Sequence, residues 1–244
     1  MASKKRSSLP LPKTAIAFRP EYLDFRRGIH VGNLEDNARI TRILKLELEA
    51  RYGEPFVTER WGRGVYWQWI GYLPRANRAA KPFSSKVSFG CSKLFLMIDT
   101  GEKLFKCGLQ VERGYVKSNR DDRVCELGPD WDWRRLLRSL TPRGKMEPEL
   151  KRLVSREGFC IQAGAWDNST KLSRSNWQGA PKLRKLLASA PPDRWAGFQL
   201  YYAMSEDEVK GSNGVDLVDA MLAIFREVTP AMNLCMQTRL AGNE

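Results

Sequence analysis

The pattern that most constrains the fold lies in the middle of the chain, where two apolar, strand-like segments flank a short turn. The segments span about residues 87–98 and 104–116, and Thr100-Gly101 supplies the turn between them. Two strands joined so closely must pair antiparallel, because a parallel pair needs a crossover connection of a dozen or more residues. The sequence therefore predicts a hairpin within a mostly antiparallel sheet.

Segments on both sides of this hairpin show the periodicities of strands and helices. Strands are predicted at residues 56–58, 65–70, 159–163 and 198–204, with a turn at 61–64 and a loop at 73–86. Helices are predicted at 33–52, from Pro129 onward, and at 147–157, 181–190 and 216–228. Asn33 would cap the first helix, and Pro230 would break the last. We therefore expect an α+β fold with a central, mostly antiparallel sheet and helices packed on it.

The length of 244 residues and the 42% hydrophobic content suit one domain with a substantial core. Residues 1–17 are basic and contain two prolines, so they are predicted to form a disordered arm ahead of a single α+β domain at 18–240. This start has no apolar h-region, and no apolar run reaches the roughly 18–20 residues of a membrane span. We expect a cytoplasmic protein that makes no membrane contact; Lys4-Lys5-Arg6 would be a nuclear address in a eukaryote.

The charge of the chain indicates an anionic partner. The formal net charge is +13, an excess that repels itself unless a polyanion or salt screens it. The chain contains five cysteines without a CxxC pair and one histidine, so its residues predict neither a metal site nor a cofactor. Nucleic acid is the partner that this balance favours most.

One interval concentrates cations and aromatic rings while excluding acids. Between Glu59 and Asp99 the chain has no Asp or Glu, although its average of 28 acids in 244 residues would place roughly four to five there. The interval holds seven cations: Arg60, Arg63, Arg75, Arg78, Lys81, Lys86 and Lys93. It also holds eight aromatics: Trp61, Tyr66, Trp67, Trp69, Tyr72, Phe83, Phe89 and Phe95. Cations neutralise phosphates, and flat rings stack on bases or fill a core.

From this interval we predict a nucleic-acid-binding protein that contacts the phosphate backbone through a basic loop beside an aromatic sheet. The candidate phosphate-binding residues are Arg60, Arg63, Arg75, Arg78, Lys81 and Lys86. The candidate stacking residues are Trp67, Trp69 and Tyr72; strand alternation would place Trp67 and Trp69 on one face. Core packing is the alternative role for these rings. The pattern does not distinguish DNA binding from RNA binding.

The residues also fit two other functions. Asp99 and Glu112 fall near the two strands of the central hairpin, where a metal-dependent nuclease would place carboxylates, but the lysine of the usual D…(D/E)-x-K array is missing. They are weak catalytic candidates for a nuclease or another enzyme on a phosphorylated substrate. A basic subunit that docks an acidic partner in a protein complex is the third hypothesis.

Three segments also follow, in order, the layout of a known family. Residues 18–25, Phe-Arg-Pro-Glu-Tyr-Leu-Asp-Phe, are similar to its opening F-P-x-x-L-x-F-L. Arg75-Ala76-Asn77-Arg78, Lys81-Pro82-Phe83 and Lys86 resemble its central basic loop, and residues 198–208 and 225–230 resemble its final strand, acidic cap and helix. On these segments the chain resembles the uncharacterised domain-of-unknown-function family 2461. The resemblance implies an α+β fold and a role for the Arg75–Lys86 loop but no reaction. The chain departs from the family at Ala76, Ala79 and Ala80, which stand where acids or Ser would be expected.

Overall fold

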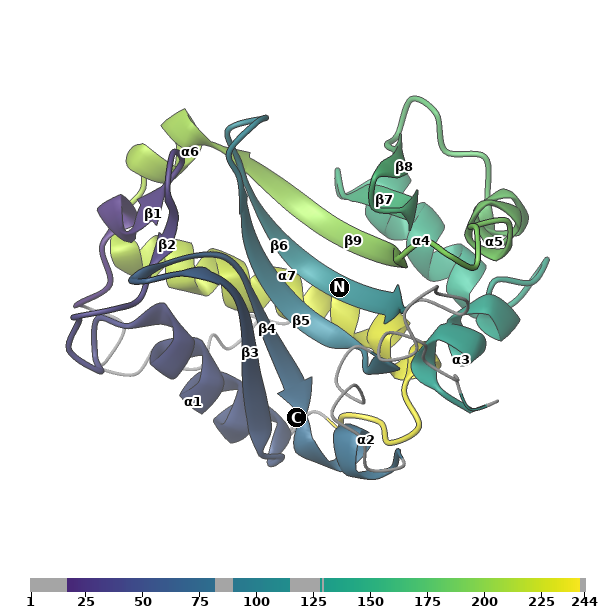
Figure 1. The fold of residues 1–244 in the computed structure, drawn as a ribbon, viewed down its shortest axis with the longest axis horizontal. Helices are drawn as coiled ribbons and strands as arrows, with labels where there is room; N and C mark the ends of the chain where they lie inside the picture. The colour runs from purple at the N-terminus through teal and green to yellow at the C-terminus, as the bar shows by residue number, and fades with distance from the viewer. Residues whose placement is uncertain (1–16, 82–89, 115–127, 129, 242–244) are drawn as a thin grey trace, which may run out of the picture.

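A curved antiparallel sheet dominates the protein, which has an α+β fold (Figure 1). The computed structural model describes residues 17–81, 90–114, 128 and 130–241. Eight strands follow the order β1-β2-β4-β5-β6-β9-β7-β8, and β3 pairs with β4 outside this path. Every pairing is antiparallel. The strands are β1 (Leu23–Asp24), β2 (Gly28–His30), β3 (Phe56–Arg63), β4 (Tyr66–Pro74), β5 (Lys93–Asp99), β6 (Leu104–Arg113), β7 (Cys160–Ala165), β8 (Asn168–Leu172) and β9 (Ala196–Ser205).

The predicted central hairpin is present as β5 and β6. Its register runs from Lys93 opposite Gln110 to Asp99 opposite Leu104. The Asp99 carboxylate closes the turn, because Oδ1 accepts hydrogen bonds from the backbone N–H groups of Gly101 and Glu102. Alternation along the strands then sends Leu94, Leu96, Ile98, Phe105, Cys107, Leu109 and Val111 into the core.

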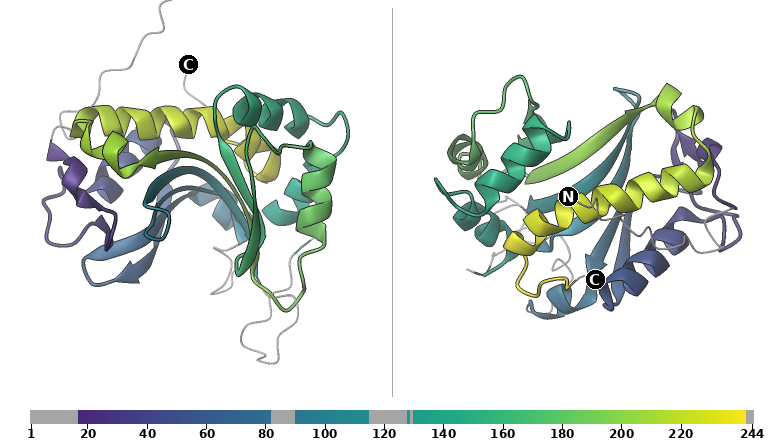
Figure 2. Two further views of the ribbon diagram at one scale, coloured as in Figure 1. Left: turned by 90° about the horizontal axis from the view of Figure 1, so that it is seen from above. Right: turned by 180° about the vertical axis from the view of Figure 1, so that it is seen from behind.

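One long helix covers the convex side of the sheet. Figure 2 shows α7 (Gly214–Cys235) lying along the arch formed by the strands, and α7 packs on β6, α3 and α4. The other helices are α1 (Ile40–Tyr52), α2 (Arg75–Ala79), α3 (Asp132–Ser139), α4 (Met146–Ser155), α5 (Ala180–Ala188) and α6 (Glu206–Lys210), with a short 3₁₀ helix at Pro20–Tyr22. None of the described helices is both long enough and apolar enough to cross a membrane.

The sheet face opposite α7, here called the polar face, carries a row of polar side chains. Register places Lys93, Gln110, Gln199, Gln162 and Lys171 at matching positions on five neighbouring strands. Because successive residues alternate between faces, the same strands supply the apolar core beneath α7. The two faces therefore differ sharply in chemistry.

Several predicted boundaries are wrong. The first helix begins at Ile40 rather than near Asn33, because Asn33 adopts a left-handed conformation (φ 55°) in a turn ahead of the helix. Residues 61–63 continue strand β3 instead of forming the predicted turn, and part of the predicted loop at 73–86 is helix α2. Helix α7 continues through Pro230, since packing outweighs the lost backbone hydrogen bond. Strand β8 was not predicted. The basic arm, apart from residue 17, lies outside the described residues.

Candidate nucleic-acid interface

A β-bulge in β4 separates two tryptophans that simple alternation places together. Trp61 pairs with Trp69 and Gly62 pairs with Trp67, so Gln68 is an extra residue with no partner on β3. The bulge turns Trp67 towards α1, whereas Trp69 points to the polar face and donates a hydrogen bond from Nε1 to Gln110 Oε1 at 2.9 Å. The prediction that the two rings share one face is therefore wrong.

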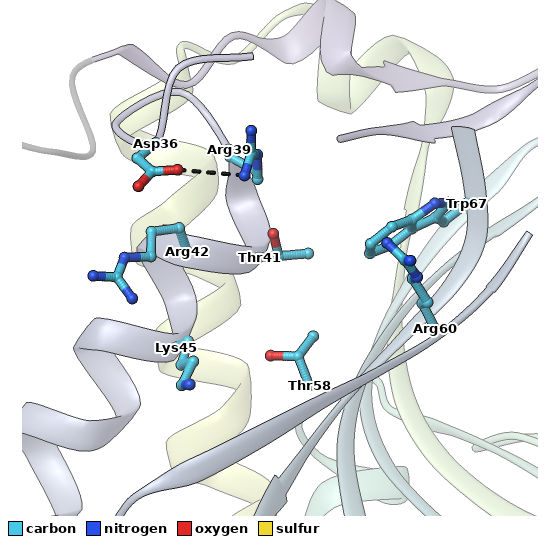
Figure 3. Close-up of a pocket in the computed structure, with 8 residues that line it drawn as sticks. All are labelled: Asp36, Arg39, Thr41, Arg42, Lys45, Thr58, Arg60 and Trp67. Carbon is cyan, nitrogen blue, oxygen red and sulfur yellow. Dashed lines mark ion pairs between the residues drawn. The ribbon is translucent and has the colours of Figure 1, made fainter. Parts of the chain in front are cut away.

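Trp67 lines a cationic pocket between α1 and β3 (Figure 3). Its volume is about 420 Å³. The lining side chains include four cations and one carboxylate, and two threonine hydroxyls lie among them. The lining residues are Asp36, Arg39, Thr41, Arg42, Lys45, Thr58, Arg60 and Trp67. Guanidinium, ammonium and hydroxyl groups are the side-chain donors that bind phosphate oxygens.

The pocket cations differ in how strongly the protein already engages them. Arg39 forms an ion pair with Asp36 at 3.3 Å, and its Nη2 donates a hydrogen bond to the Leu34 carbonyl. Lys45 lies 3.8 Å from a Glu49 carboxylate oxygen, at the outer limit of an ion pair. Within the described residues, the exposed Arg42 guanidinium has no hydrogen bond or ion pair. Arg42 therefore keeps its full bonding capacity for an anion.

Arg60 is held against an aromatic ring rather than against an acid. Its guanidinium carbon lies 4.0 Å from the centre of the Trp67 ring, a cation–π contact. The Trp67 ring is itself fixed, because it packs on the core and its Nε1 donates to the Gly64 carbonyl at 3.3 Å. The contact orients Arg60 without neutralising its charge.

The start of α1 adds a favourable dipole to the pocket. Arg39 occupies the N-cap position, and its side chain does not cap the first turn through a hydrogen bond. The first turn contains no acidic residue, although Thr41 and Arg42 from that turn line the pocket. The positive end of a helix dipole favours bound anions.

The end of the β3–β4 hairpin continues this arrangement of cations and rings. Tyr66 lies between the Arg27 guanidinium, 4.2 Å from its ring centre, and the His30 ring, stacked at 4.8 Å. Arg63 is exposed opposite Tyr66, and Trp61 is 69% exposed. We call the α1–β3 pocket and this hairpin end, with residues 60–63, the basic surface.

The polar face, by contrast, neutralises its own charges. The buried Lys93 ammonium lies 2.6 Å from Glu112 Oε2 and 3.9 Å from Glu59. Trp195 Nε1 donates to Glu112 Oε1 at 3.0 Å, and Trp166 Nε1 donates to the same oxygen at 3.4 Å. The Lys93 charge is therefore already balanced and not available to a phosphate.

This network shifts the pKa values of both partners. Burial raises the pKa of Glu112, but the Lys93 ammonium and the hydrogen bonds that the carboxylate accepts outweigh burial, so this pKa lies below its ordinary value. Burial lowers the pKa of Lys93, but Glu112 and Glu59 outweigh it, so this pKa lies above its ordinary value. Both shifts favour the ionised pair.

Asp99 and Glu112 do not meet. Asp99 is paired with Leu104 at one end of the hairpin, while Glu112 lies eight residues further along β6, roughly 27 Å away at 3.4 Å per residue. Asp99 is also engaged by Lys106 at 2.7 Å. The two carboxylates cannot hold one metal ion, so this pair does not form the nuclease site considered from the sequence. The described residues contain no group of three His, Cys, Asp or Glu side chains that could bind a metal.

The predicted basic loop is divided between a helix and a buried ion pair. Lys81 has a fully buried side chain whose Nζ lies 2.9 Å from Asp132 Oδ1, and it donates to the Asn77 carbonyl at 3.0 Å. The prediction that Lys81 binds phosphate is therefore wrong, because its charge is already paired inside the protein. Arg75 is exposed and Arg78 half-buried on α2, while Lys86 lies outside the described residues.

Tyr72 and the helix α2 are also separated from the basic surface. Tyr72 is completely buried, with its hydroxyl donating to the Ile40 carbonyl at 3.3 Å, so it cannot stack on a base. Arg75 follows the far end of β4, about 30 Å along the strand from the Arg63 end. Of the predicted site residues that the structure describes, Arg60, Arg63 and Trp67 are the ones brought together on the basic surface.

Sequence reasoning missed the contribution of α1. Arg39, Arg42 and Lys45 recur at three-residue intervals, which places them along one side of a helix. That spacing was visible in the sequence, but Glu47 and Glu49 follow these cations on the same predicted helix and gave it a mixed charge. The sequence carries no comparable signal that β3 packs beside this helix.

Comparisons with protein-family models, curated proteins and solved structures found no significant match for this chain. The resemblance to domain-of-unknown-function family 2461 therefore stays a prediction.

Proposed function

We propose that this protein binds nucleic acid through the phosphate backbone, with the basic surface as its contact site. The observation that carries the proposal is the α1–β3 pocket, in which four cations face one carboxylate beside a tryptophan. Phosphate contacts supply most of the sequence-independent affinity of nucleic-acid-binding proteins. This replaces the Arg75–Lys86 loop as the proposed centre of binding.

Three cations carry the proposal furthest. Arg42 has no partner among the described residues, Lys45 has only a weak one, and Arg60 is oriented by a ring that leaves its charge intact. Each can bind a phosphate oxygen without first breaking a strong internal ion pair. The Thr41 and Thr58 hydroxyls supply further hydrogen bonds.

The test compares two triple variants with the same change in charge. Arg42→Glu/Lys45→Glu/Arg60→Glu reverses the pocket, and Lys182→Glu/Arg184→Glu/Lys185→Glu reverses three exposed cations on α5. Binding is measured by fluorescence anisotropy with labelled single-stranded and duplex oligonucleotides. The loss of affinity is expected to be at least tenfold greater for the pocket variant than for the α5 variant. Equal losses of affinity in the two variants would mean that the overall positive charge of the protein attracts nucleic acid, and would overturn the assignment of the site.

Two competitors distinguish nucleic acid from other anionic partners. Heparin and an acidic Glu-rich peptide are titrated against the bound oligonucleotide at matched charge concentration. The proposal expects both to compete much more weakly than unlabelled oligonucleotide. Displacement by the acidic peptide at equal concentration would favour an acidic protein partner, and equivalence with heparin would leave only generic polyanion binding.

A further inference from the structure

Trp61 is exposed to a degree that packing does not explain. It is 69% exposed, and Leu46, at 36%, is the other exposed large hydrophobic residue in the described part of the chain. Leaving most of an indole in water forgoes the free energy that burial would provide. The ring lies in β3, directly after Arg60 and two residues before Arg63.

The position of Trp61 at the sheet edge makes it reachable by a ligand on the basic surface. Among the described strands, β3 pairs only with β4, so its other side is an edge. Arg60 and Thr58 face the pocket from β3, and alternation points Trp61 to the opposite side of the same strand. A chain that crosses this edge would pass the pocket cations first and the Trp61 ring next.

The hairpin that carries Trp61 is held in a defined geometry. A Cβ atom added at Gly62 would lie 2.5 Å from the Cα of Trp67, so the two strands approach as closely as only glycine allows. Gly64 has φ 59° and forms the left-handed turn. Little conformational freedom in the backbone is then lost when a ligand contacts the ring.

An exposed ring beside cations selects for unpaired bases. In a duplex the faces of the bases are covered by their neighbours, so a side chain at a protein edge meets backbone and grooves. In a single strand each base can present its face to an aromatic ring, and this stacking tolerates any sequence. Resting on the proposed function, we infer that the ligand is single-stranded nucleic acid, with phosphates in the α1–β3 pocket and a base stacked on Trp61.

The experiment separates the base from the phosphate. Binding of wild type, Trp61→Ala and Trp61→Phe is measured with three probes of equal length: a mixed-sequence single strand, a hairpin duplex and a single strand made of abasic sites. Leu46→Ala, which removes the other exposed large apolar side chain of the described residues, next to Lys45 on α1, is the matched control. Thermal unfolding of each variant checks that the fold is intact.

The inference expects wild type to bind the single strand more tightly than the duplex or the abasic strand. Trp61→Ala should weaken single-strand binding about 5- to 150-fold, the range of one lost stacking contact, and leave abasic binding unchanged. Trp61→Phe should restore part of the loss, and Leu46→Ala should have no effect. Equal weakening on all three probes, or tighter duplex binding by wild type, would overturn the inference.

Failure of the inference and failure of the proposed function give different results. If abasic strand and duplex bind through the pocket but Trp61→Ala changes nothing, the phosphate site stands and the stacking role is wrong. If none of the probes binds, the proposed function itself fails. If Trp61→Ala abolishes the capture of a protein and leaves oligonucleotide binding unchanged, Trp61 belongs to a protein interface and the inference is overturned.

Discussion

The Arg60 guanidinium lies over the face of Trp67, 4.0 Å from the ring centre, and this contact joins the edge strand β3 to the pocket beside α1. The pair depends on the bulge at Gln68, which turns Trp67 to the α1 side of the sheet. A cation oriented by a ring has no counter-charge beside it, whereas the charge of one oriented by a carboxylate is already balanced. The geometry therefore concentrates positive charge at the point where β3 and α1 meet.

The Arg60–Trp67 contact should appear as a coupling in unfolding experiments. In a double-mutant cycle of Arg60→Met and Trp67→Leu, which keep apolar bulk at both positions, we expect a coupling of about 0.5–1 kcal/mol in the free energy of unfolding. Urea denaturation of the four proteins measures it. Strict additivity would show that the two side chains do not interact in solution.

The Glu112 carboxylate should make stability depend on acid pH. Its pKa lies below the ordinary value in the folded protein, so its contribution is complete above the unfolded pKa of about 4.3 and is lost as pH falls through the lower folded value. Urea midpoints of wild type and Glu112→Gln, measured from pH 7 to pH 3, should therefore converge as the pH falls. A difference that stays constant across this range would contradict the shifted pKa.

The buried Lys81–Asp132 pair should be costly to break on one side. Asp132 also accepts hydrogen bonds from Asn77 Nδ2 at 2.8 Å and from the Ser92 backbone N–H at 2.5 Å. Asp132→Ala leaves a buried ammonium without its carboxylate, and we expect a loss of about 3–5 kcal/mol in stability. Lys81→Met/Asp132→Leu, which removes both charges, should reduce the free energy of unfolding by less than Asp132→Ala does. A double variant that is as unstable as the sum of both single variants would refute this explanation.

Close approach of β6 and β9 should make Gly108 intolerant of a side chain. A Cβ atom there would lie 2.0 Å from the Leu200 carbonyl oxygen, which belongs to the neighbouring strand and cannot rotate away. Gly108→Ala is expected to destabilise the protein by at least about 1–3 kcal/mol. Gly101→Ala in the exposed turn, where the nearest atom is an Asp99 carboxylate oxygen at 3.5 Å, is the control. Equal melting temperatures for the two variants would contradict the crowding at Gly108.

The sequence predicted those parts of the fold that depend on local pattern. The turn at Thr100-Gly101 and the alternation around it indicated the β5–β6 hairpin. The capping box of Ser205 and Glu208 at the start of α6 likewise follows from a local S-x-x-E pattern. The register of β3 on β4 is not a local property. One extra residue at Gln68 turns the Trp67 side chain to the opposite face of the sheet, and the alternation of residues from Val65 to Ile70 does not indicate this bulge.

The candidate site was predictable only in part, for a related reason. Whether a lysine binds an external phosphate or an internal carboxylate depends on residues distant in sequence, as Lys81 with Asp132 and Lys93 with Glu112 demonstrate. An acid-free interval therefore does not mean that its cations are free, because acids from other elements pair with two of them, Lys81 and Lys93. Arg60 and Arg63 remain on the basic surface because β3 forms an edge of the sheet.

The salt dependence of binding tests the central claim most directly. We compare wild type with Arg42→Gln/Lys45→Gln/Arg60→Gln, and with Lys182→Gln/Arg184→Gln/Lys185→Gln as the matched control, by titrating a single-stranded oligonucleotide across salt concentrations. If the three pocket cations contact phosphates, the slope of log K against log salt should become shallower by about 2, at roughly 0.7 per single-strand phosphate, while the control keeps the wild-type slope. An unchanged slope in the pocket variant would contradict the claim that these cations bind the backbone.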